Sequence, residues 1–340
     1  MKLSDRKRKI LQYVVDDYIT TAQPVSSKSI TEKYLKDVSS ATVRSELAGL
    51  EEMGLLTQLH TSSGRVPSIE AYKLYVGELM EKGKLTTKEI NFIKNAFNEH
   101  SDNLESVVQN AVKVISELTD YTSVAYAAHN EKEKIEKIDI FRYKEDQALL
   151  LIVTENTLIR DKFIKIPKSM SDAQIREASG LISKLFVGKE FGEVKELSGK
   201  VSEEFSLYKD IFASVMSAIE EYIGKDGVSV MIEGEGKILN HPEYADADKV
   251  KNFLSVVTDR EKLTDILVDD NDNIEINIKI GGENGENLPS DCSLVTATYS
   301  ASGVKVGTYG VIGPLRMDYQ KVVSVLEGVG KILEDILKNK

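Results

Sequence analysis

The first 67 residues contain three short helical patterns followed by a two-stranded pattern, and this order constrains the fold more than any other feature. A serine precedes each helical pattern, where its side chain can accept a hydrogen bond from the first turn: Ser4, Ser26, and Ser39 or Ser40. Gly54 is suited to end the third helix in a left-handed conformation. Three helices and a hairpin in this order predict a winged helix-turn-helix, a motif whose third helix enters the major groove of DNA.

The third helix has two chemically different faces. Val43, Leu47 and Leu50 recur at helical spacing and predict the face that packs on the core. The opposite face is small and polar with one arginine, which suits close approach to base edges and phosphates. The candidate DNA-binding residues on this helix are Ser39, Ser40, Ala41, Thr42, Arg44, Ser45 and Ala48.

The two-stranded pattern predicts the wing. Residues 55–59 and 65–66 are predicted strands, the polar turn 61–64 lies between them, and Pro67 closes the unit. Candidates for contact with the sugar-phosphate chain or a minor groove are His60, Thr61, Ser62, Gly64 and Arg65. Weaker candidates for backbone contacts elsewhere in the segment are Arg6, Lys7, Ser26, Ser27 and Lys28.

The net charge of −11 at first argues against a nucleic-acid ligand, because phosphate contacts dominate affinity for DNA. The charge is unevenly distributed: residues 1–75 hold 11 basic and 9 acidic side chains, and the remainder holds 33 and 46. The predicted winged helix is therefore weakly basic, and the acidic remainder would hold nonspecific DNA binding low. A second interpretation stays open, because winged helices also serve as protein-interaction modules and the third helix carries Glu46, Glu51 and Glu52.

Beyond the hairpin the hydrophobic period is first helical and then, after residue 120, mostly two. Helices are expected at 72–80, from Thr86 or Thr87, from Ser101, at 172–186, 202–223, 247–257 and 263–267, and from Asp318. Strands are expected at 122–128, 135–142, 148–154, 158–166, 228–232, 274–280, 294–299 and 304–312. At 340 residues this mixture predicts an α+β protein of two or three domains.

Several classes of protein are disfavoured. The basic start runs quickly into Asp16 and Asp17, unlike a signal peptide, and the longest apolar run, 148–153, is far short of a membrane span. The single cysteine, Cys292, excludes an intramolecular disulfide, and the four histidines have no carboxylate or cysteine at ligand spacing. No glycine-rich segment continues into the Lys-Ser/Thr of a P-loop. We expect a cytoplasmic protein that is not an enzyme and holds no cofactor or metal.

Two sets of short motifs lie near the two ends of the chain. The first set is 3–11, 18–19, 24–27, 39–44, 50–56 and 60–67, and the second is 293–299 and 307–323, in which the run Gly310–Tyr319 is especially specific. Together they closely resemble the heat-inducible transcription repressor HrcA family, while the middle of the chain matches only loosely.

The resemblance implies a repressor of chaperone operons that binds double-stranded DNA at an inverted-repeat operator as a homodimer. It also implies that a GroEL-type chaperonin maintains the active form. The implied domains are a winged helix-turn-helix with a connecting helix over 1–83, a GAF-like domain with an antiparallel sheet over 84–130 and 228–340, and an inserted α+β dimerisation domain over 131–227. An alternative is a metabolite-sensing regulator whose GAF-like domain binds a small molecule.

Overall fold

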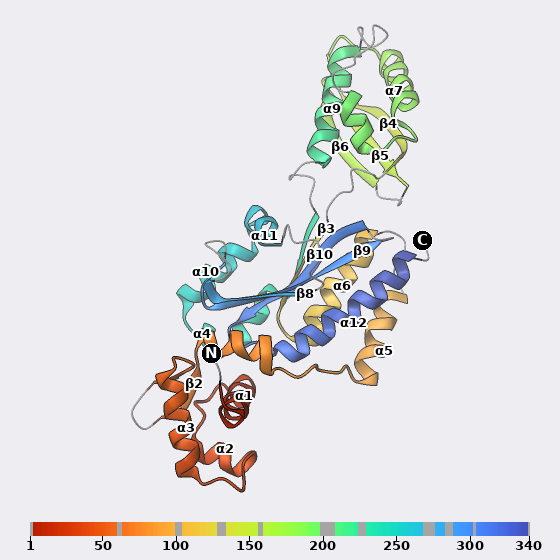
Figure 1. Ribbon diagram of the computed structural model, residues 1–340. Coiled ribbons are helices and arrows are strands. Elements are labelled where there is room, and N and C mark those ends of the chain that lie inside the picture. The colour runs from red at the N-terminus through yellow and green to blue at the C-terminus, as the bar shows by residue number, and fades with distance from the viewer. Residues whose placement is uncertain are drawn as a thin grey trace. The chain divides into compact units, whose positions relative to one another are not determined.

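A computed structural model of the chain describes residues 3–59, 63–98, 104–127, 134–155, 159–197, 208–223, 229–267, 276–282, 288–301 and 304–338. The chain forms two compact units (Figure 1). The terminal unit comprises Met1–Asn95, Ala111–Ala125 and Ile232–Lys340. The inserted unit comprises Ala96–Asn110 and Tyr126–Met231. The α+β class with antiparallel sheets, predicted from the sequence, is confirmed.

The N-terminal part of the terminal unit, which we call the head, is the predicted set of three helices and a hairpin. Its elements are α1 (Asp5–Thr21), α2 (Ser27–Lys33), α3 (Ser40–Glu52), β1 (Leu56–Gln58) and β2 (Arg65–Pro67). The caps are serines, as expected: the side chains of Ser4, Ser26 and Ser39 accept backbone hydrogen bonds from Lys7, Ser29 and Thr42. Gly54 follows α3 with a φ of 74°, in the left-handed region.

The core of the head is assembled from one face of each helix. Ile10, Leu11 and Val14 of α1 are fully buried, as are Ile30 of α2 and Val43 of α3. The other two residues of the predicted inner face of α3, Leu47 and Leu50, are buried with them. The third helix therefore turns its opposite face away from the core.

A buried carboxylate fixes the second helix on the first. Asp17 of α1 is 7% exposed and accepts hydrogen bonds from Ser29 at 3.1 Å and Lys33 at 2.6 Å, both on α2. The hydrogen bond to Asp17 raises the pKa of Lys33, so the lysine stays charged across the neutral range. These bonds hold α2 against the end of α1.

A helical connection follows the head. The single helix expected at 72–80 begins earlier, as α4 (Ile69–Leu74), and then widens into one π-helical turn, η1 (Tyr75–Leu79). The helices α5 (Thr87–Asn98) and α6 (Leu104–Thr119) come next, and Thr86 forms reciprocal hydrogen bonds with Glu89 at the start of α5.

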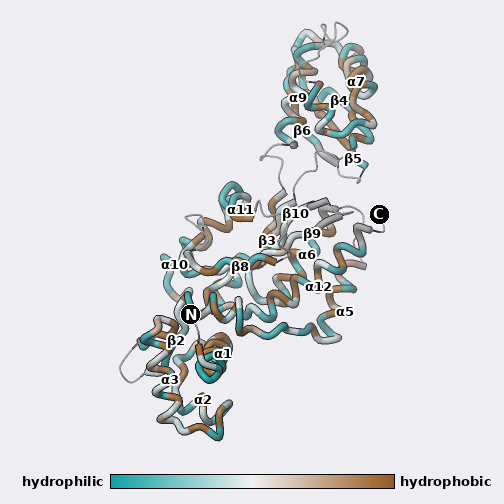
Figure 2. The backbone as a smooth tube through the Cα atoms, in the orientation of Figure 1, coloured by the Kyte–Doolittle hydropathy of each residue, from teal (hydrophilic) through white to brown (hydrophobic). Residues whose placement is uncertain are grey.

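The remainder of the terminal unit is built on a five-stranded sheet. Its strands, β3 (Thr122–Ala127), β7 (Ser229–Glu233), β8 (Ile276–Ile280), β9 (Cys292–Ala301) and β10 (Val304–Pro314), run in the order β7-β3-β10-β9-β8. The last helix, α12 (Tyr319–Lys338), packs on β9 and β10, and Figure 2 shows hydrophobic and hydrophilic residues alternating along it. The remaining helical elements are η5 (Glu235–Asn240), η6 (Pro242–Tyr244), α10 (Ala247–Val257) and α11 (Arg260–Leu267).

The neighbouring strands β3 and β7 are separated in sequence by the inserted unit. There β4 (Ile135–Lys144), β5 (Gln147–Thr154) and β6 (Ile159–Lys165) form an antiparallel meander, as expected. The helices described after the meander are α7 (Asp172–Phe186), α8 (Phe191–Glu196) and α9 (Lys209–Ile223). The sequence did not predict α8, and the described part of α9 begins later than the expected residue 202. Among the described helices, none is both long and apolar enough to cross a membrane.

Candidate nucleic-acid interface

The outward face of α3 has the composition predicted for it. Ala41, Arg44 and Ser45 are exposed, and Thr42 and Ala48 are partly exposed. Within the described part of the chain, Arg44 forms no ion pair, so its guanidinium is free to meet a base edge or a phosphate. The helix thus offers small side chains and one arginine on the side opposite its buried residues.

The two serines at the start of α3 have different roles. Ser39 caps the helix with its Oγ 3.1 Å from the amide nitrogen of Thr42, and it also lies 2.8 Å from the Thr42 hydroxyl. Ser40 instead forms a 3.0 Å hydrogen bond with Ser27 of α2. Ser39 is exposed while Ser27 is only 8% exposed, so Ser39 can meet a phosphate at the helix N-terminus and Ser27 is mainly a packing residue.

The first acidic residue of α3 is neutralised from within the head. Glu46 lies 2.8 Å from the ammonium group of Lys7 and 3.9 Å from the guanidinium of Arg6, both on α1. Lys7 is therefore engaged in holding α1 against α3, whereas Arg6, with 57% of its side chain exposed, keeps most of its surface open. The carboxylate of Glu46, which in the sequence disfavours DNA binding, therefore forms its ion pairs within the head.

The second acidic residue of α3 is bound by the wing. Glu51 accepts from Nε and Nη2 of Arg65, each at 2.8 Å, and only 16% of the Arg65 side chain is exposed. The Arg65 backbone also pairs with Val25, through two hydrogen bonds of 2.8 Å. In this arrangement Arg65 neutralises Glu51 and fastens β2 to α3, so we expect its effect on DNA to pass through the position of the wing. Neither contact was foreseen from the sequence, because nothing local marks a partner 14 or 39 residues away.

The wing is described only in part. Gly64 lies so close to the backbone of Val25 that a Cβ at this position would stand 2.5 Å from a backbone carbonyl. The predicted contact residues His60, Thr61 and Ser62 lie outside the described residues. Elsewhere on the head, Ser26 and Lys28 are exposed near the start of α2, and Lys28 pairs loosely with Glu32 at 3.7 Å.

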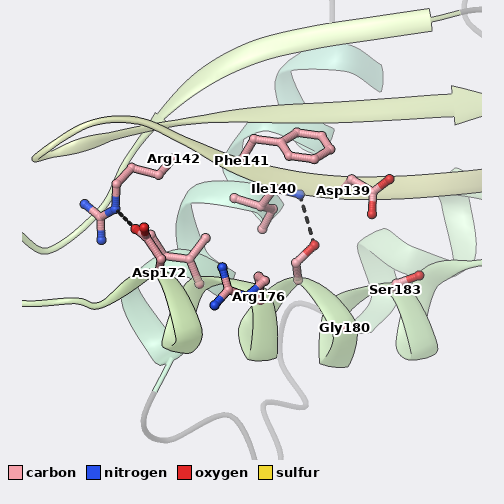
Figure 3. Close-up of a pocket in the computed structure, with 10 residues that line it drawn as sticks. Asp139, Ile140, Phe141, Arg142, Asp172, Arg176, Gly180 and Ser183 are labelled. Atoms are coloured by element: carbon pink, nitrogen blue, oxygen red, sulfur yellow. Dashed lines mark hydrogen bonds and ion pairs between the residues drawn. The ribbon is translucent and has the colours of Figure 1, made fainter.

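A pocket in the inserted unit provides a contrast with this surface. It lies between β4 and α7 and is lined by Asp139, Ile140, Phe141, Arg142, Asp172, Ile175, Arg176, Ser179, Gly180 and Ser183 (Figure 3). Arg142 is bound to Asp172 and to the carbonyl of Glu145, and Ser179 accepts the amide of Ile140 at 3.0 Å. Arg142, Asp172 and Ser179 are thus bound by partners within the inserted unit. Among the described residues, no cluster of three or more His, Cys, Asp or Glu side chains is placed to hold a metal ion.

Comparison with known proteins places the chain in a family. The family model described as "HrcA protein C terminal domain" matches residues 105–323. A heat-inducible transcription repressor HrcA from Ruminiclostridium cellulolyticum is 39% identical, over 99% of this chain and 99% of its own length. Another, from Pelotomaculum thermopropionicum, is 34% identical over 99% of this chain and 98% of its own.

A solved structure agrees with the fold. It is described as the crystal structure of a hypothetical protein at 2.2 Å resolution and covers 99% of both chains, with a TM-score of 0.65 and 22% identity. That likeness concerns the fold alone, whereas the sequence matches extend over the whole chain, head included. The chain therefore belongs to the HrcA family of heat-inducible transcription repressors.

Proposed function

We propose that this protein represses transcription of heat-shock genes by binding DNA through α3 and the wing of its head, without catalytic activity. The observation that carries this proposal is the outward face of α3, where exposed Ala41, Ser45 and Arg44 stand together while Glu46 and Glu51 are neutralised by partners inside the head. A small, polar face with a free arginine suits the major groove. Phosphate contacts would come from Ser39, from Arg6 and from the wing residues His60, Thr61 and Ser62.

We further propose that the protein acts as a homodimer in the cytoplasm, with residues 131–227 as the dimerisation domain and the GAF-like domain over 84–130 and 228–340. The support is an uncovered side of the three-stranded sheet. Phe141 and Tyr143 on β4 and Phe163 on β6, which we call the aromatic face, are 51%, 57% and 52% exposed. Phe141 and Phe163 both pair in register with Leu149 of β5, so Phe141, Leu149 and Phe163 form one row across the sheet, and the ring centroids of Tyr143 and Phe163 lie 4.8 Å apart. An exposed apolar face of this kind marks a protein-interaction surface.

A dimer with two heads would read two half-sites related by the same twofold axis, which is the reason for an inverted-repeat operator. The GroEL-type chaperonin is carried over from the family resemblance as the partner that maintains the active repressor.

The test is a titration of the full chain, at fixed salt, on three duplexes: a chaperone-operon inverted repeat, its single half-site, and a scrambled sequence. We expect binding to the inverted repeat to exceed binding to the scrambled duplex by about 10³-fold or more. Adding a GroEL-type chaperonin with ATP should increase the fraction of protein that binds. Equal affinity for the repeat and the scrambled duplex would contradict the proposal.

A further inference from the structure

The end of α1 is bound by an arginine that lies far from the head in sequence. Arg316, between β10 and α12, donates from Nη1 to the carbonyl oxygen of Ile19 at 2.5 Å, across 297 residues of chain. The same guanidinium holds Glu243 of η6 with two further bonds, Nε to Oε1 at 2.5 Å and Nη2 to Oε2 at 3.3 Å. Only 12% of the Arg316 side chain is exposed.

The acceptor on α1 is available because of how that helix ends. Ala22 adopts a left-handed conformation with a φ of 55°, and the amide of Gln23 turns to the hydroxyl of Thr21 at 3.2 Å. The carbonyl of Ile19 is thereby left without its usual partner four residues on, and the last turn of a helix carries partial negative charge. The guanidinium of Arg316 donates a hydrogen bond to this carbonyl oxygen, and its positive charge is favourable beside the negative end of the helix. Because the guanidinium is planar and has several N–H donors, it can bind a carboxylate and a carbonyl oxygen at the same time.

The surroundings of the pair favour a fixed geometry. Burial on its own would raise the pKa of Glu243, but the hydrogen bond and charge of Arg316 outweigh it, and the pKa lies below its usual value. Breaking a half-buried pair of this kind leaves a desolvated charge, so the contact resists partial opening. Two further side-chain bonds join α1 to structure outside the head, Tyr75 to Asp16 and Arg8 to Glu78, and both come from η1, the connection that follows the head in sequence.

We propose that Arg316 is a positioning residue for DNA binding. From the segment between β10 and α12 it caps α1 and so fixes the direction in which the head presents α3. Two half-sites are bound together only when both heads have the right separation and direction, so freedom of the head lowers the effective concentration of the second head at its half-site. The effect on DNA rests on the proposed function, whereas the effect on the head does not.

The experiment measures the direction of the head without DNA. Spin labels at Lys36→Cys in the head and Lys251→Cys on α10 occupy exposed sites, and the labelled chain is diluted with unlabelled protein so that intrachain distances dominate. The native thiol does not interfere, because burial raises the pKa of Cys292 to about 12. The distance distribution is compared for the parent, Arg316→Met, Glu243→Gln, and the control Arg142→Met. Arg142 likewise binds a carboxylate and backbone carbonyls, all inside the inserted unit.

We expect Arg316→Met to broaden the distance distribution, Glu243→Gln to broaden it less, and Arg142→Met to leave it unchanged. Affinity for the inverted repeat should fall about 5-fold or more with Arg316→Met, within the range of ordinary coupling between sites, while affinity for a single half-site stays unchanged. An unchanged distribution in folded Arg316→Met would overturn the proposal. If that variant does not fold, an unchanged distribution in Glu243→Gln would overturn it instead.

The two arms separate this inference from the proposed function. If neither the parent nor any variant binds the inverted repeat more tightly than the scrambled duplex, the proposed function fails. The distance distributions then still decide whether Arg316 fixes the direction of the head. If the distribution broadens while affinity for the inverted repeat is unchanged or higher, the positioning role in DNA binding is wrong.

Discussion

In the head, two acidic side chains of α3, Glu46 and Glu51, are bound by basic side chains of α1 and β2, while Glu52 is exposed at the end of the helix. The face of α3 around Ala41, Arg44 and Ser45 is small, polar and singly basic. In the inserted unit, by contrast, the three-stranded sheet buries Ile138, Ile140 and Ile152 on one side and leaves the aromatic face on the other. Both regions rest on an ordinary apolar core. They differ in the surface that they expose, which is polar and basic on α3 and apolar on the three-stranded sheet. The first surface suits a nucleic acid and the second suits another apolar protein surface.

The comparison also explains how an acidic protein can bind DNA. The ion pairs Lys7–Glu46 and Arg65–Glu51 neutralise two carboxylates of the helix that would meet phosphate. Each pair uses one basic side chain, and Arg44 stays exposed. The aromatic face has no charged group that could bind a phosphate, whereas burying it against a second apolar surface is favourable. Separate substitutions in the two regions should therefore separate DNA reading from self-association.

The largest effect is expected from charge placed on the aromatic face. If the protein dimerises as proposed, Phe141→Asp combined with Phe163→Asp should convert the proposed dimer to a monomer, because two carboxylates would be buried unpaired in the interface. Affinity for the inverted repeat should fall by about 10²- to 10⁴-fold through loss of the second head, and affinity for a half-site should persist. Sedimentation and DNA titration measure the two quantities.

The matched control for this prediction is Leu239→Asp. Leu239 is also a large apolar side chain, 60% exposed, but it lies in η5 of the terminal unit. A monomer with undiminished affinity for the inverted repeat, or a dimer that survives both substitutions, would refute the role given to the aromatic face.

A smaller effect is expected from the free arginine of α3. Arg44→Ala should cost about 1–3 kcal/mol of discrimination between operator and scrambled DNA, because a base contact is lost while phosphate contacts remain. Dimer formation and thermal stability should not change. Arg176→Ala, another exposed arginine but on α7 of the inserted unit, serves as the control. If both variants keep the same ratio of operator to scrambled affinity as the parent, Arg44 does not read bases.

The wing contact should matter less still. Arg65→Ala is expected to lower stability by about 1 kcal/mol and to weaken operator and scrambled DNA alike, because the wing loses its attachment to Glu51. The dependence of affinity on salt should keep its slope, since Arg65 neutralises a carboxylate in the protein. Glu51→Gln should act in the same direction. A slope reduced by about one in Arg65→Ala alone would show that Arg65 contacts a phosphate.

The sequence predicted the head well because its signals are local. A serine cap, an apolar stripe and a terminal glycine each act within one or two helical turns, so Ser4, Ser26 and Gly54 mark helix ends correctly. The choice between Ser39 and Ser40 stayed open because either hydroxyl can cap. The structure assigns the cap to Ser39, since Ser40 is turned toward Ser27.

Other features could not be predicted, for physical reasons. The helix α8 has six residues, and its two buried apolar side chains, Phe191 and Val194, are too few to establish a helical period. Reciprocal hydrogen bonds of Glu190 and Glu193 mark its start. Cys292, expected in an acidic loop, is buried at the start of β9 beside Tyr244. The contacts that complete the candidate interface join residues far apart in sequence, and only the folded chain brings Lys7 to Glu46.

The smallest predicted effect concerns acid and the contact of Arg316 with Glu243. The folded-state pKa of Glu243 lies below its usual 4.5 because the bond from Arg316 outweighs the opposing effect of burial. A carboxyl group with a lowered pKa stabilises the fold fully above its unfolded pKa and loses that contribution as the pH falls through its folded value. The parent should therefore be more stable than Glu243→Gln at pH 7, and the difference should shrink progressively below pH 4.5. Chemical denaturation of both proteins from pH 7 to pH 3.5 measures it, and comparing the two cancels every other carboxylate that titrates. Because α1 is held through the same guanidinium, the label distances of the parent should broaden over the same pH range. A stability difference that stays constant with pH would mean that the ionised state of Glu243 contributes nothing to holding the head.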